Sequence, residues 1–227
     1  MIVAQASTDR AFFQWDWVLA HWSELGEQTV EHLFLTGTSV AIGLVISAAL
    51  AAVALRWSGT FGPIIGVGGV LYSVPSLALF ALLVPFTGLT SRTTAIIPLV
   101  TYTILILVRN MVTGIRSVPA EVVEAAQGMG LRRRQVFMKV EVPLALPTFF
   151  AGLRITTVTI VGLVTVTALL GFGGLGQFIL NGFRKSIVFP TEIIVGMVAS
   201  VLLAMVLDFA LLQAQRVTTP WLRRPRS

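Results

Sequence analysis

The chain has 227 residues, of which 56% are hydrophobic and only 11% carry a charge, and its mean hydropathy is +0.89. Because soluble domains carry about 25% charged residues, this composition excludes an ordinary soluble domain and predicts an integral membrane protein with one compact membrane domain. The sequence contains no cysteine, which excludes disulfides and thiol chemistry.

Residues 1–30 are predicted to form an extracytoplasmic or interfacial segment. They begin without a basic stretch followed by an apolar one, so no cleaved signal peptide is expected. The tryptophans of a short amphipathic helix fit an anchor at the membrane surface, and the alternative is an aromatic cage for a quaternary ammonium. The apolar residues at helical spacing are Phe12, Trp15, Val18, Leu19 and Trp22. His21 and His32 are interpreted as ordinary polar residues, because no second ligand-rich cluster would make them a metal site.

Five apolar stretches are long enough to cross a bilayer, which takes about 20 helical residues, so the predicted fold class is all-α with about five transmembrane helices. The stretches are Leu33–Leu55, Phe61–Phe86, Ala95–Val112, Thr148–Leu170 and Ile193–Leu212. Pro63 and Pro75 are expected to break the second stretch. Between the last two, Leu175–Phe183 is predicted to be a half-helix or surface helix that does not cross, with a short sixth span as the alternative.

Two motifs bear on nucleotide binding, and neither predicts it. Gly171, Gly173 and Gly176 match G-x-G-x-x-G, but a membrane span rather than a strand precedes them, so a tight bend between helices is the better interpretation. No G-x-x-x-x-G-K-[ST] motif occurs in the chain, so it has no phosphate-binding loop of its own for ATP. No cofactor and no metal are expected.

Polar groups inside the spans need partners or water, because unpaired charges are costly at membrane depth. The structural interpretation is an ion pair between Asp208 and either Arg154 or Arg109, and the functional alternative is a proton or ion relay. The sequence Ser73-Val74-Pro75-Ser76 removes a hydrogen bond from the middle of a span, which indicates either a packing kink or the lining of an aqueous path.

The segment 121–147 is too charged to span a bilayer and too long for a tight turn. Its pattern predicts two short helices. For the first, Ser117 is a candidate N-cap, Pro119 fits the first turn, and Gly128 and Gly130 fit the end. Gly130 is expected to adopt a positive φ or to lie close against a neighbour, where a bulkier residue would clash.

A basic second helix is expected to follow Leu131 and to close at Pro143 and Pro147. Three consecutive arginines place this polar helix pair on the cytoplasmic side, and five spans then put the N-terminus outside and the C-terminus inside. The basic residues gather inside under this orientation, and the net charge of +6 therefore needs no nucleic-acid partner. The inner residues are Arg56, Arg109, Arg116, Arg132, Arg133, Arg134, Lys139, Arg154, Arg216, Arg223, Arg224 and Arg226, and the outer ones are Arg10, Arg92, Arg184 and Lys185.

The same segment resembles the Glu-Ala-Ala loop of the type-1 transmembrane domain of ABC importer permeases. It reads Glu124-Ala125-Ala126, three residues, Gly130, nine residues, Val140, one residue and Val142-Pro143. The family usually has Ile and Leu at the two valine positions, but the spacing is kept throughout. The resemblance extends from about residue 31 to 212. The stretches LYSVPSLALFALLVPFTGL (71–89), VEVPLALPTFFAGLR (140–154) and GFGGLGQFILNGF (171–183) are most similar to osmoprotectant permeases.

The resemblance implies a permease subunit of an ATP-driven importer for osmoprotectants such as glycine betaine, choline or carnitine, in the cytoplasmic (inner) membrane. A methionine-like amino-acid importer is the alternative cargo. Residues 31–212 would form the transmembrane domain, with a coupling loop at about 117–143, and residues 213–227 a basic cytoplasmic tail. The implied ATPase-coupling residues are Glu121, Glu124, Ala125, Ala126, Gly130, Val140 and Pro143, and those of the translocation path are Tyr72, Ser73, Pro75 and Ser76. Tyr72 could offer a ring face to a cation.

The implied partners are cytoplasmic ABC ATPase subunits, a second permease copy or a homologous permease, an extracytoplasmic substrate-binding protein and the lipid bilayer. The chain itself would not be an enzyme, since its partner would hydrolyse the ATP. Two alternatives come from other classes. A membrane enzyme would need a catalytic constellation that the spans do not hold, and a passive channel would not need the Glu-Ala-Ala loop.

Overall fold

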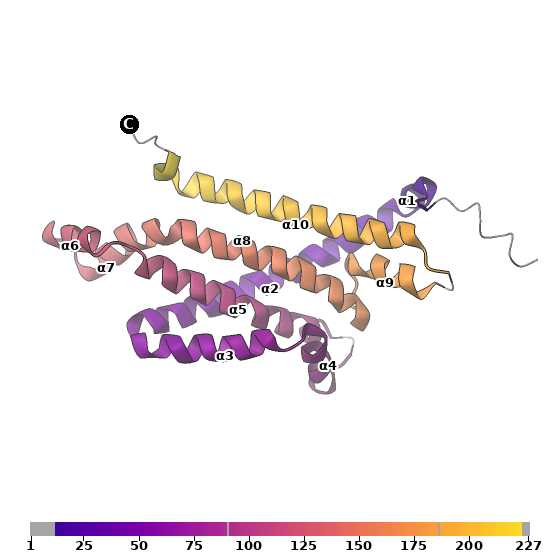
Figure 1. Ribbon diagram of the computed structural model, residues 1–227, viewed down its shortest axis with the longest axis horizontal. Helices are drawn as coiled ribbons and strands as arrows, with labels where there is room; N and C mark the ends of the chain where they lie inside the picture. Colours follow the sequence, from indigo (N-terminus) through magenta and orange to yellow (C-terminus); the bar gives the residue numbers. More distant parts are fainter. Residues whose placement is uncertain (1–11, 90, 186, 224–227) are drawn as a thin grey trace, which may run out of the picture.

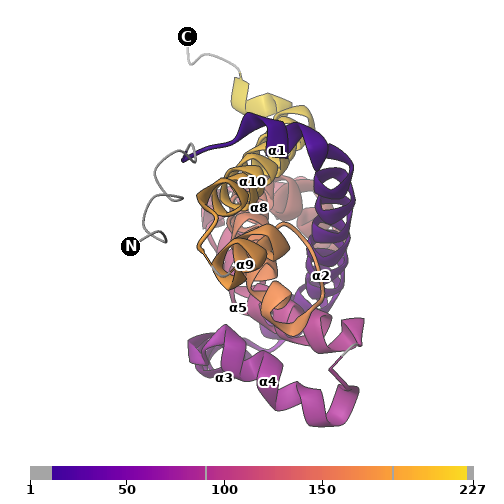
Figure 2. The same cartoon turned by 90° about the vertical axis from the view of Figure 1, so that its right-hand side faces the viewer.

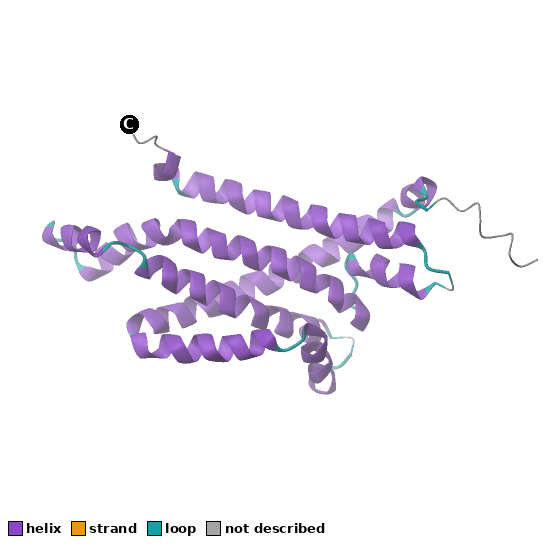
Figure 3. Cartoon of the chain, in the orientation of Figure 1, coloured by secondary structure: helices purple, strands orange, loops and turns teal. Residues whose placement is uncertain are grey.

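The computed structural model describes residues 12–89, 91–185 and 187–223, and over these ranges the chain is helical without a β-strand (Figures 1 and 3). The predicted all-α fold class is therefore confirmed. The α-helices are α1 (Trp15–Ala20), α2 (Trp22–Arg56), α3 (Phe61–Ser73), α4 (Ser76–Thr87), α5 (Arg92–Arg116), α6 (Ala120–Gly128), α7 (Arg133–Val136), α8 (Val142–Thr167), α9 (Gly176–Arg184) and α10 (Pro190–Thr218). Shorter turns of other helix types are η1 (Ser58–Thr60), η2 (Phe137–Glu141), η3 (Ala168–Leu170) and η4 (Pro220–Arg223).

Four helical segments are long and apolar enough to cross a membrane: α2, α5, the continuous helix Arg133–Leu170 and α10. A fifth span results if α3 and α4 are counted together, although they meet at an angle of 93°. This agrees with the prediction of about five spans. Neither half of the bent pair could cross alone, because a 13-residue helix such as α3 is about 20 Å long and the hydrocarbon core is about 30 Å thick.

Helix α5 lies at the centre of the bundle and packs against α2, α3, α4 and α8. Small residues let these helices approach closely, as is usual between membrane helices. A Cβ atom at Gly43 of α2 would stand 1.7 Å from Oγ1 of Thr103 in α5, and one at Gly152 of α8 would stand 2.5 Å from Cβ of Asn110. The largest buried cluster, which includes Leu35, Phe80, Leu99, Ile160 and Val164, joins α2, α4, α5 and α8.

The two ends of the bundle differ. Figure 1 shows α6 and α7 projecting at one end, whereas α1, α4 and α9 lie at the opposite end. Figure 2, which looks along the bundle from that opposite end, shows α2 along one side, and α2 packs there against α5 and α8. Helix α10 begins beside α9 and ends toward the α6–α7 end, so the chain enters and leaves the bundle at opposite ends, as five spans require.

The short helix before α10 does not cross. Helix α9 has nine residues and packs along α10, so the predicted half-helix is confirmed and the sixth span is excluded. The glycine motif before it makes the predicted tight bend: Gly171 and Gly173 have φ values of +81° and +74°. Gly176 has no room for a side chain, since a Cβ atom there would stand 2.1 Å from the carbonyl oxygen of Thr165.

Two predictions about prolines were wrong. Pro63 does not break α3, because it lies in the first turn, where its missing N–H is not needed. Pro143 and Pro147 do not close the second loop helix, which continues through both of them. Just before Pro143 the helix widens into a π-helical turn, η2, and so changes its hydrogen-bond register instead of ending.

Two helix starts also differ from prediction. Ser117 does not cap the first loop helix; it ends α5, where its Oγ donates to the carbonyl oxygen of Gly114 at 2.8 Å. Pro119 takes the capping position of α6. The predicted amphipathic N-terminal helix is present as α1, but it is only six residues long, and Trp22 already belongs to α2. The basic residues Arg10, Arg224 and Arg226 lie outside the described residues.

Candidate functional site

The first helix of the projecting loop, α6, has a single buried residue, which is small. Ala126 is buried, whereas Glu121, Glu124 and Ala125 are exposed. The carbonyl oxygen of Pro119 accepts hydrogen bonds from the N–H groups of the third and fourth residues after it, which starts the helix without a side-chain cap. One face of α6 thus presents two carboxylates and an alanine to solvent.

Gly130 terminates α6 in a Schellman motif. The N–H of Leu131 donates to the carbonyl oxygen of Ala126 at 3.3 Å, and the N–H of Gly130 donates to that of Gln127 at 2.9 Å. Gly130 has a φ of +85°, so the expected positive φ is confirmed. The alternative of close packing is wrong for this chain, because a Cβ atom at Gly130 would meet nothing within 4 Å.

The second loop helix is fused to a membrane span. Gln135 accepts a hydrogen bond at 2.8 Å from the N–H of Arg132 and so caps the start of α7. Val136 is buried, and Val140 and Pro143 are half-buried in the helix that continues into α8. Because Arg133–Leu170 is one helix, a displacement of the loop can pass directly into the bundle.

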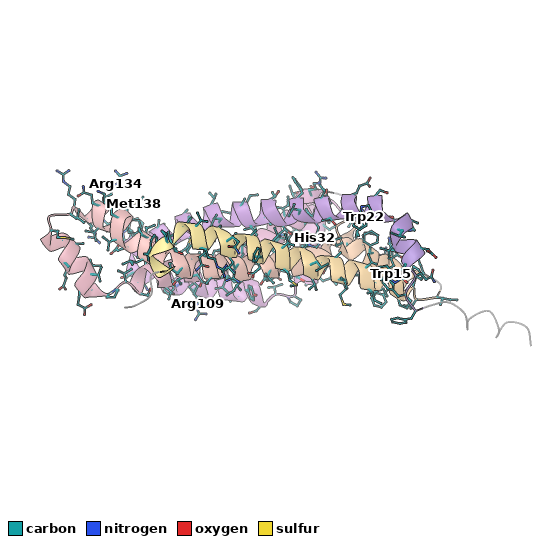
Figure 4. The ribbon with its side chains drawn as sticks, turned by 90° about the horizontal axis from the view of Figure 1, so that it is seen from above. Trp15, Trp22, His32, Arg109, Arg134 and Met138 are labelled. Carbon is teal, nitrogen blue, oxygen red and sulfur yellow. The ribbon has the colours of Figure 1, made fainter. Side chains whose placement is uncertain are left out.

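A groove of about 980 Å³ separates the loop from the ends of the spans. Its lining residues are Leu55, Ile115, Val123, Gln127, Leu131, Arg133, Arg134, Val136, Phe137 and Glu141. The loop therefore stands away from the bundle and does not pack flat onto it. Figure 4 shows Arg134 and Met138 at this end, far from Trp15 and Trp22 at the other.

The loop charges are available to another molecule. Glu121 and Glu124 form no salt bridge with any described basic side chain, and Arg132–Arg134 are exposed. An exposed apolar side chain, Met129, lies between them with 76% of its surface accessible. An exposed methionine near exposed arginines in the sequence is suited to a protein partner.

The second predicted site is the break between α3 and α4. Tyr102 of α5 donates a hydrogen bond from its hydroxyl to the carbonyl oxygen of Val74, one of the backbone groups in the break. The ring of Tyr72 packs edge-on against that of Tyr102, with centroids 5.5 Å apart. Ser73 and Pro75 are exposed in the single chain and Ser76 is half-buried. The contacts with Tyr102 fit a packing kink, and the exposed Ser73 and Pro75 fit the lining of an aqueous path. The geometry is therefore compatible with both interpretations.

Arg154 and Asp208 form the predicted ion pair. Nε of Arg154 donates to Oδ1 of Asp208 at 2.7 Å, and Nη2 donates to Oδ2 at 2.6 Å. The alternative pair with Arg109 is wrong, because Arg109 is exposed and forms no salt bridge among the described residues (Figure 4). The Arg154–Asp208 pair ties α8 to α10 at membrane depth.

Two polar contacts at the opposite end were missed from the sequence. His32 is fully buried and bonds to α8 and to the bend before α9. Lys185 pairs with the nearly buried Glu192 and lies 5.6 Å from the ring centroid of Trp17. The partners of His32 are 129 and 143 residues away, so no local pattern joins them. Lys185 and Glu192 are close in sequence, but the contact depends on how the end of α9 and the first turn of α10 are placed.

The three N-terminal tryptophans do not form a cage. Trp15 and Trp22 are 70% and 69% exposed, whereas Trp17 packs on His21 and on the rings of Phe178 and Phe189. No group of three or more His, Cys, Asp or Glu residues that could hold a metal occurs in the described parts of the chain.

Residues 43–224 match the family described as binding-protein-dependent transport system inner membrane component. The chain belongs to this family of ABC importer permeases. It is accordingly a multi-pass permease of the inner membrane and a transport subunit, as predicted. Most of the chain, including the projecting loop and both predicted sites, lies within the matched range.

Two relatives of this ABC permease are named for the transport of choline, glycine betaine or carnitine. The chain is 35% identical to the choline transport system permease protein of Bacillus subtilis (strain 168), over 87% of this chain and 89% of that protein. It is 33% identical to the glycine betaine/carnitine/choline transport system permease protein of the same organism, over 87% and 89%. Its fold is similar to that of the MetNI methionine ABC transporter in an inward-facing conformation, with a TM-score of 0.74, 24% identity, and 86% and 96% of the two chains covered.

Proposed function

We propose that this chain is the membrane-spanning subunit of an ATP-driven importer for osmoprotectants such as glycine betaine, choline or carnitine. The support is the 33–35% identity, over most of the chain, to permeases whose names state these cargoes. The likeness to the methionine transporter is 24% in sequence and concerns the fold alone, so the methionine-like cargo has the weaker support.

The observation that carries the transport mechanism is the exposed loop at one end of the bundle. It presents the Glu-Ala-Ala residues Glu124 and Ala125 to solvent, and its second helix is continuous with a membrane span. We infer that cytoplasmic ABC ATPase subunits bind this loop, since the chain has no phosphate-binding motif of its own. Closure of the ATPase dimer would move α6, and the helix Arg133–Leu170 would carry that movement into the bundle.

The same proposal predicts the other subunits of the transporter and its orientation in the membrane. A second copy of the chain or a homologous permease would complete the translocation path, with Tyr72, Ser73, Pro75 and Ser76 facing it. An extracytoplasmic binding protein would deliver the substrate to the end that carries α1, α4 and α9, in keeping with the family description. The loop would lie in the cytoplasm together with the C-terminal tail 213–227, and residues 1–30 would lie outside.

An uptake experiment tests the proposal directly. The permease, co-expressed with its ATPase and binding protein, is reconstituted into vesicles, and uptake of labelled glycine betaine is measured with ATP inside. We expect uptake that excess choline or carnitine inhibits and excess methionine does not. Inhibition by methionine alone would support the amino-acid importer instead. Uptake without ATP would indicate a channel, and failure of the permease to co-purify with an ATPase would contradict the coupling assignment.

A further inference from the structure

A hollow opens beside the intramembrane ion pair. It has a volume of about 540 Å³, within the range of ligand pockets, and lies between α8 and α10. Its lining residues are Ala151, Arg154, Ile155, Val158, Thr159 and Asp208. The walls are thus mainly small or apolar, and the two charged groups face each other across one side of them. Ala151, Ile155 and Val158 are exposed in the single chain, whereas the neighbouring Gly152 is buried against Asn110 of α5.

The ion pair keeps binding capacity toward the hollow. The guanidinium of Arg154 has five N–H donors, and the hydrogen bonds to Asp208 use two of them. The side chains of Arg154 and Asp208 are 30% and 31% exposed, so each charged group contributes surface to the hollow. A structural pair at membrane depth would be expected to bury both groups, because exposure of charge to hydrocarbon is costly.

The charge balance of the site selects its ligand. Arg154 and Asp208 together carry no net charge, and no other charged group lines the hollow among the described residues. A cation or an anion bound there would leave an uncompensated charge in a medium of low dielectric constant. A zwitterion would not, because its carboxylate can bind the guanidinium while its cation lies against the carboxylate of Asp208.

We propose that Arg154 and Asp208 bind the carboxylate and the quaternary ammonium of a zwitterionic substrate during transport, and so favour glycine betaine or carnitine over the cation choline. This inference rests on the proposed osmoprotectant function. A quaternary ammonium has no N–H to donate, so it binds through charge and through contacts of its methyl groups, for which Ala151, Ile155 and Val158 provide apolar walls. In the absence of substrate the two side chains bind each other.

The decisive measurement is a ratio of two uptake rates. In the reconstituted complex, uptake of glycine betaine and of choline is compared for the unaltered permease and for Arg154→Gln. The variant leaves the carboxylate of Asp208 alone in the hollow, so the site becomes negative. We expect the ratio of glycine betaine to choline uptake to fall about tenfold or more. The same binding protein delivers both substrates, so a change in the ratio arises in the permease.

A second variant tests the proposal if the Arg154→Gln permease does not insert into the membrane. Arg154→Gln/Asp208→Asn removes both charges and keeps two groups that can bond to each other. Gln and Asn can still bond to each other and leave neither charge unpaired, so a purely structural pair predicts normal uptake by this variant. Our proposal predicts loss of glycine betaine uptake at an unchanged protein level. Arg92→Gln, which breaks the exposed pair with Glu31 at the other end, is the control and should leave the ratio unchanged.

The outcomes separate this inference from the proposed function. If the unaltered complex transports both substrates and Arg154→Gln leaves the ratio unchanged, or the doubly neutral variant transports glycine betaine normally, the ion pair is structural and this inference is wrong while the proposed function stands. If the unaltered complex transports neither substrate, the proposed function fails and this inference fails with it.

Discussion

Nε2 of His32 in α2 lies 3.0 Å from the carbonyl oxygen of Val161 in α8. Its other ring nitrogen, Nδ1, accepts a hydrogen bond at 3.2 Å from the N–H of Leu175, so Nε2 must carry the proton and donate to Val161. A single buried, neutral imidazole therefore holds α2, α8 and the bend before α9 together.

Replacement of this histidine should loosen the end of the bundle that carries α9. In His32→Leu the N–H of Leu175 loses its partner in a buried place, which costs about 1–3 kcal/mol of unfolding free energy. We expect a lower midpoint of thermal unfolding in detergent, followed by tryptophan fluorescence. His21→Leu is the control, because His21 is only half-buried and stacks on Trp17. Equal midpoints for the two variants would contradict the assigned role of His32.

The contrast between His32 and Gly130 shows what the sequence could reveal. Gly130 ends a short helix through contacts with residues three to five positions away, so local pattern alone predicted its backbone. The partners of His32 are 129 and 143 residues away, and no local pattern indicates them. The spans were predictable for the same reason. A membrane helix is recognised from a run of about 20 consecutive apolar residues, which is again a local feature of the sequence.

Proline gave the least reliable prediction. Pro75 does separate two helices, as expected, but the helix passes through Pro143 and Pro147. The difference lies in how the backbone near each proline completes its hydrogen bonds. At Pro75 the chain turns and Tyr102 satisfies the carbonyl of Val74, whereas before Pro143 a π-helical turn changes the register. Neither remedy can be read from the residues next to the proline.

The orientation of the chain is open to a reporter experiment. A reporter fused after Arg134, in α7, should be cytoplasmic, because the basic residues of the loop favour that side. A reporter near Gln5, outside the described residues, should be external, since an odd number of spans separates the two positions. If both reporters lie on the same side of the membrane, the bent pair α3–α4 does not count as a span.

Ser73 and Ser76 should be accessible to water along the translocation path. The chain contains no cysteine, so a single Ser73→Cys or Ser76→Cys variant carries one thiol that can be labelled without background. We expect reaction with a small aqueous thiol reagent in the assembled transporter, at a rate that changes when ATP is trapped. Ser39→Cys is the control and should not react, because Ser39 is fully buried in α2. Inertness at both test positions would leave the break as a packing feature alone.

Charge on the exposed face of α6 should govern binding of the ATPase. Glu124 is exposed and has no described intrachain ion-pair partner, so Glu124→Lys changes the docking face without disturbing the fold. We expect substrate-stimulated ATP hydrolysis to fall about tenfold or more, which corresponds to about 1.4 kcal/mol of lost interaction. Glu121→Lys, one turn earlier, should have a milder effect. A larger effect of the Glu121 variant would move the contact toward the start of α6.

Gly130 offers the sharpest test of the loop as the transmission element. At a φ of +85° a β-branched residue strains the backbone by about 1–2 kcal/mol, with no added steric clash, since a Cβ atom there meets nothing within 4 Å. Gly130→Val should therefore change the turn between α6 and α7 while the spans still insert and the protein level stays nearly normal. It should weaken ATPase binding and abolish substrate-stimulated hydrolysis and uptake.

Two matched variants separate backbone strain from loss of a glycine as such. Gly130→Asn should retain much of the uptake, because asparagine tolerates the left-handed conformation better than valine does. Gly128→Ala, two residues earlier in α6, should be neutral, since Gly128 is helical and a Cβ atom there also meets nothing within 4 Å. If uptake is highest for Gly128→Ala, lower for Gly130→Asn and lowest for Gly130→Val, the conformation at residue 130 couples the ATPase to the bundle. Normal uptake by Gly130→Val in reconstituted vesicles would instead mean that the movement reaches α8 by another route.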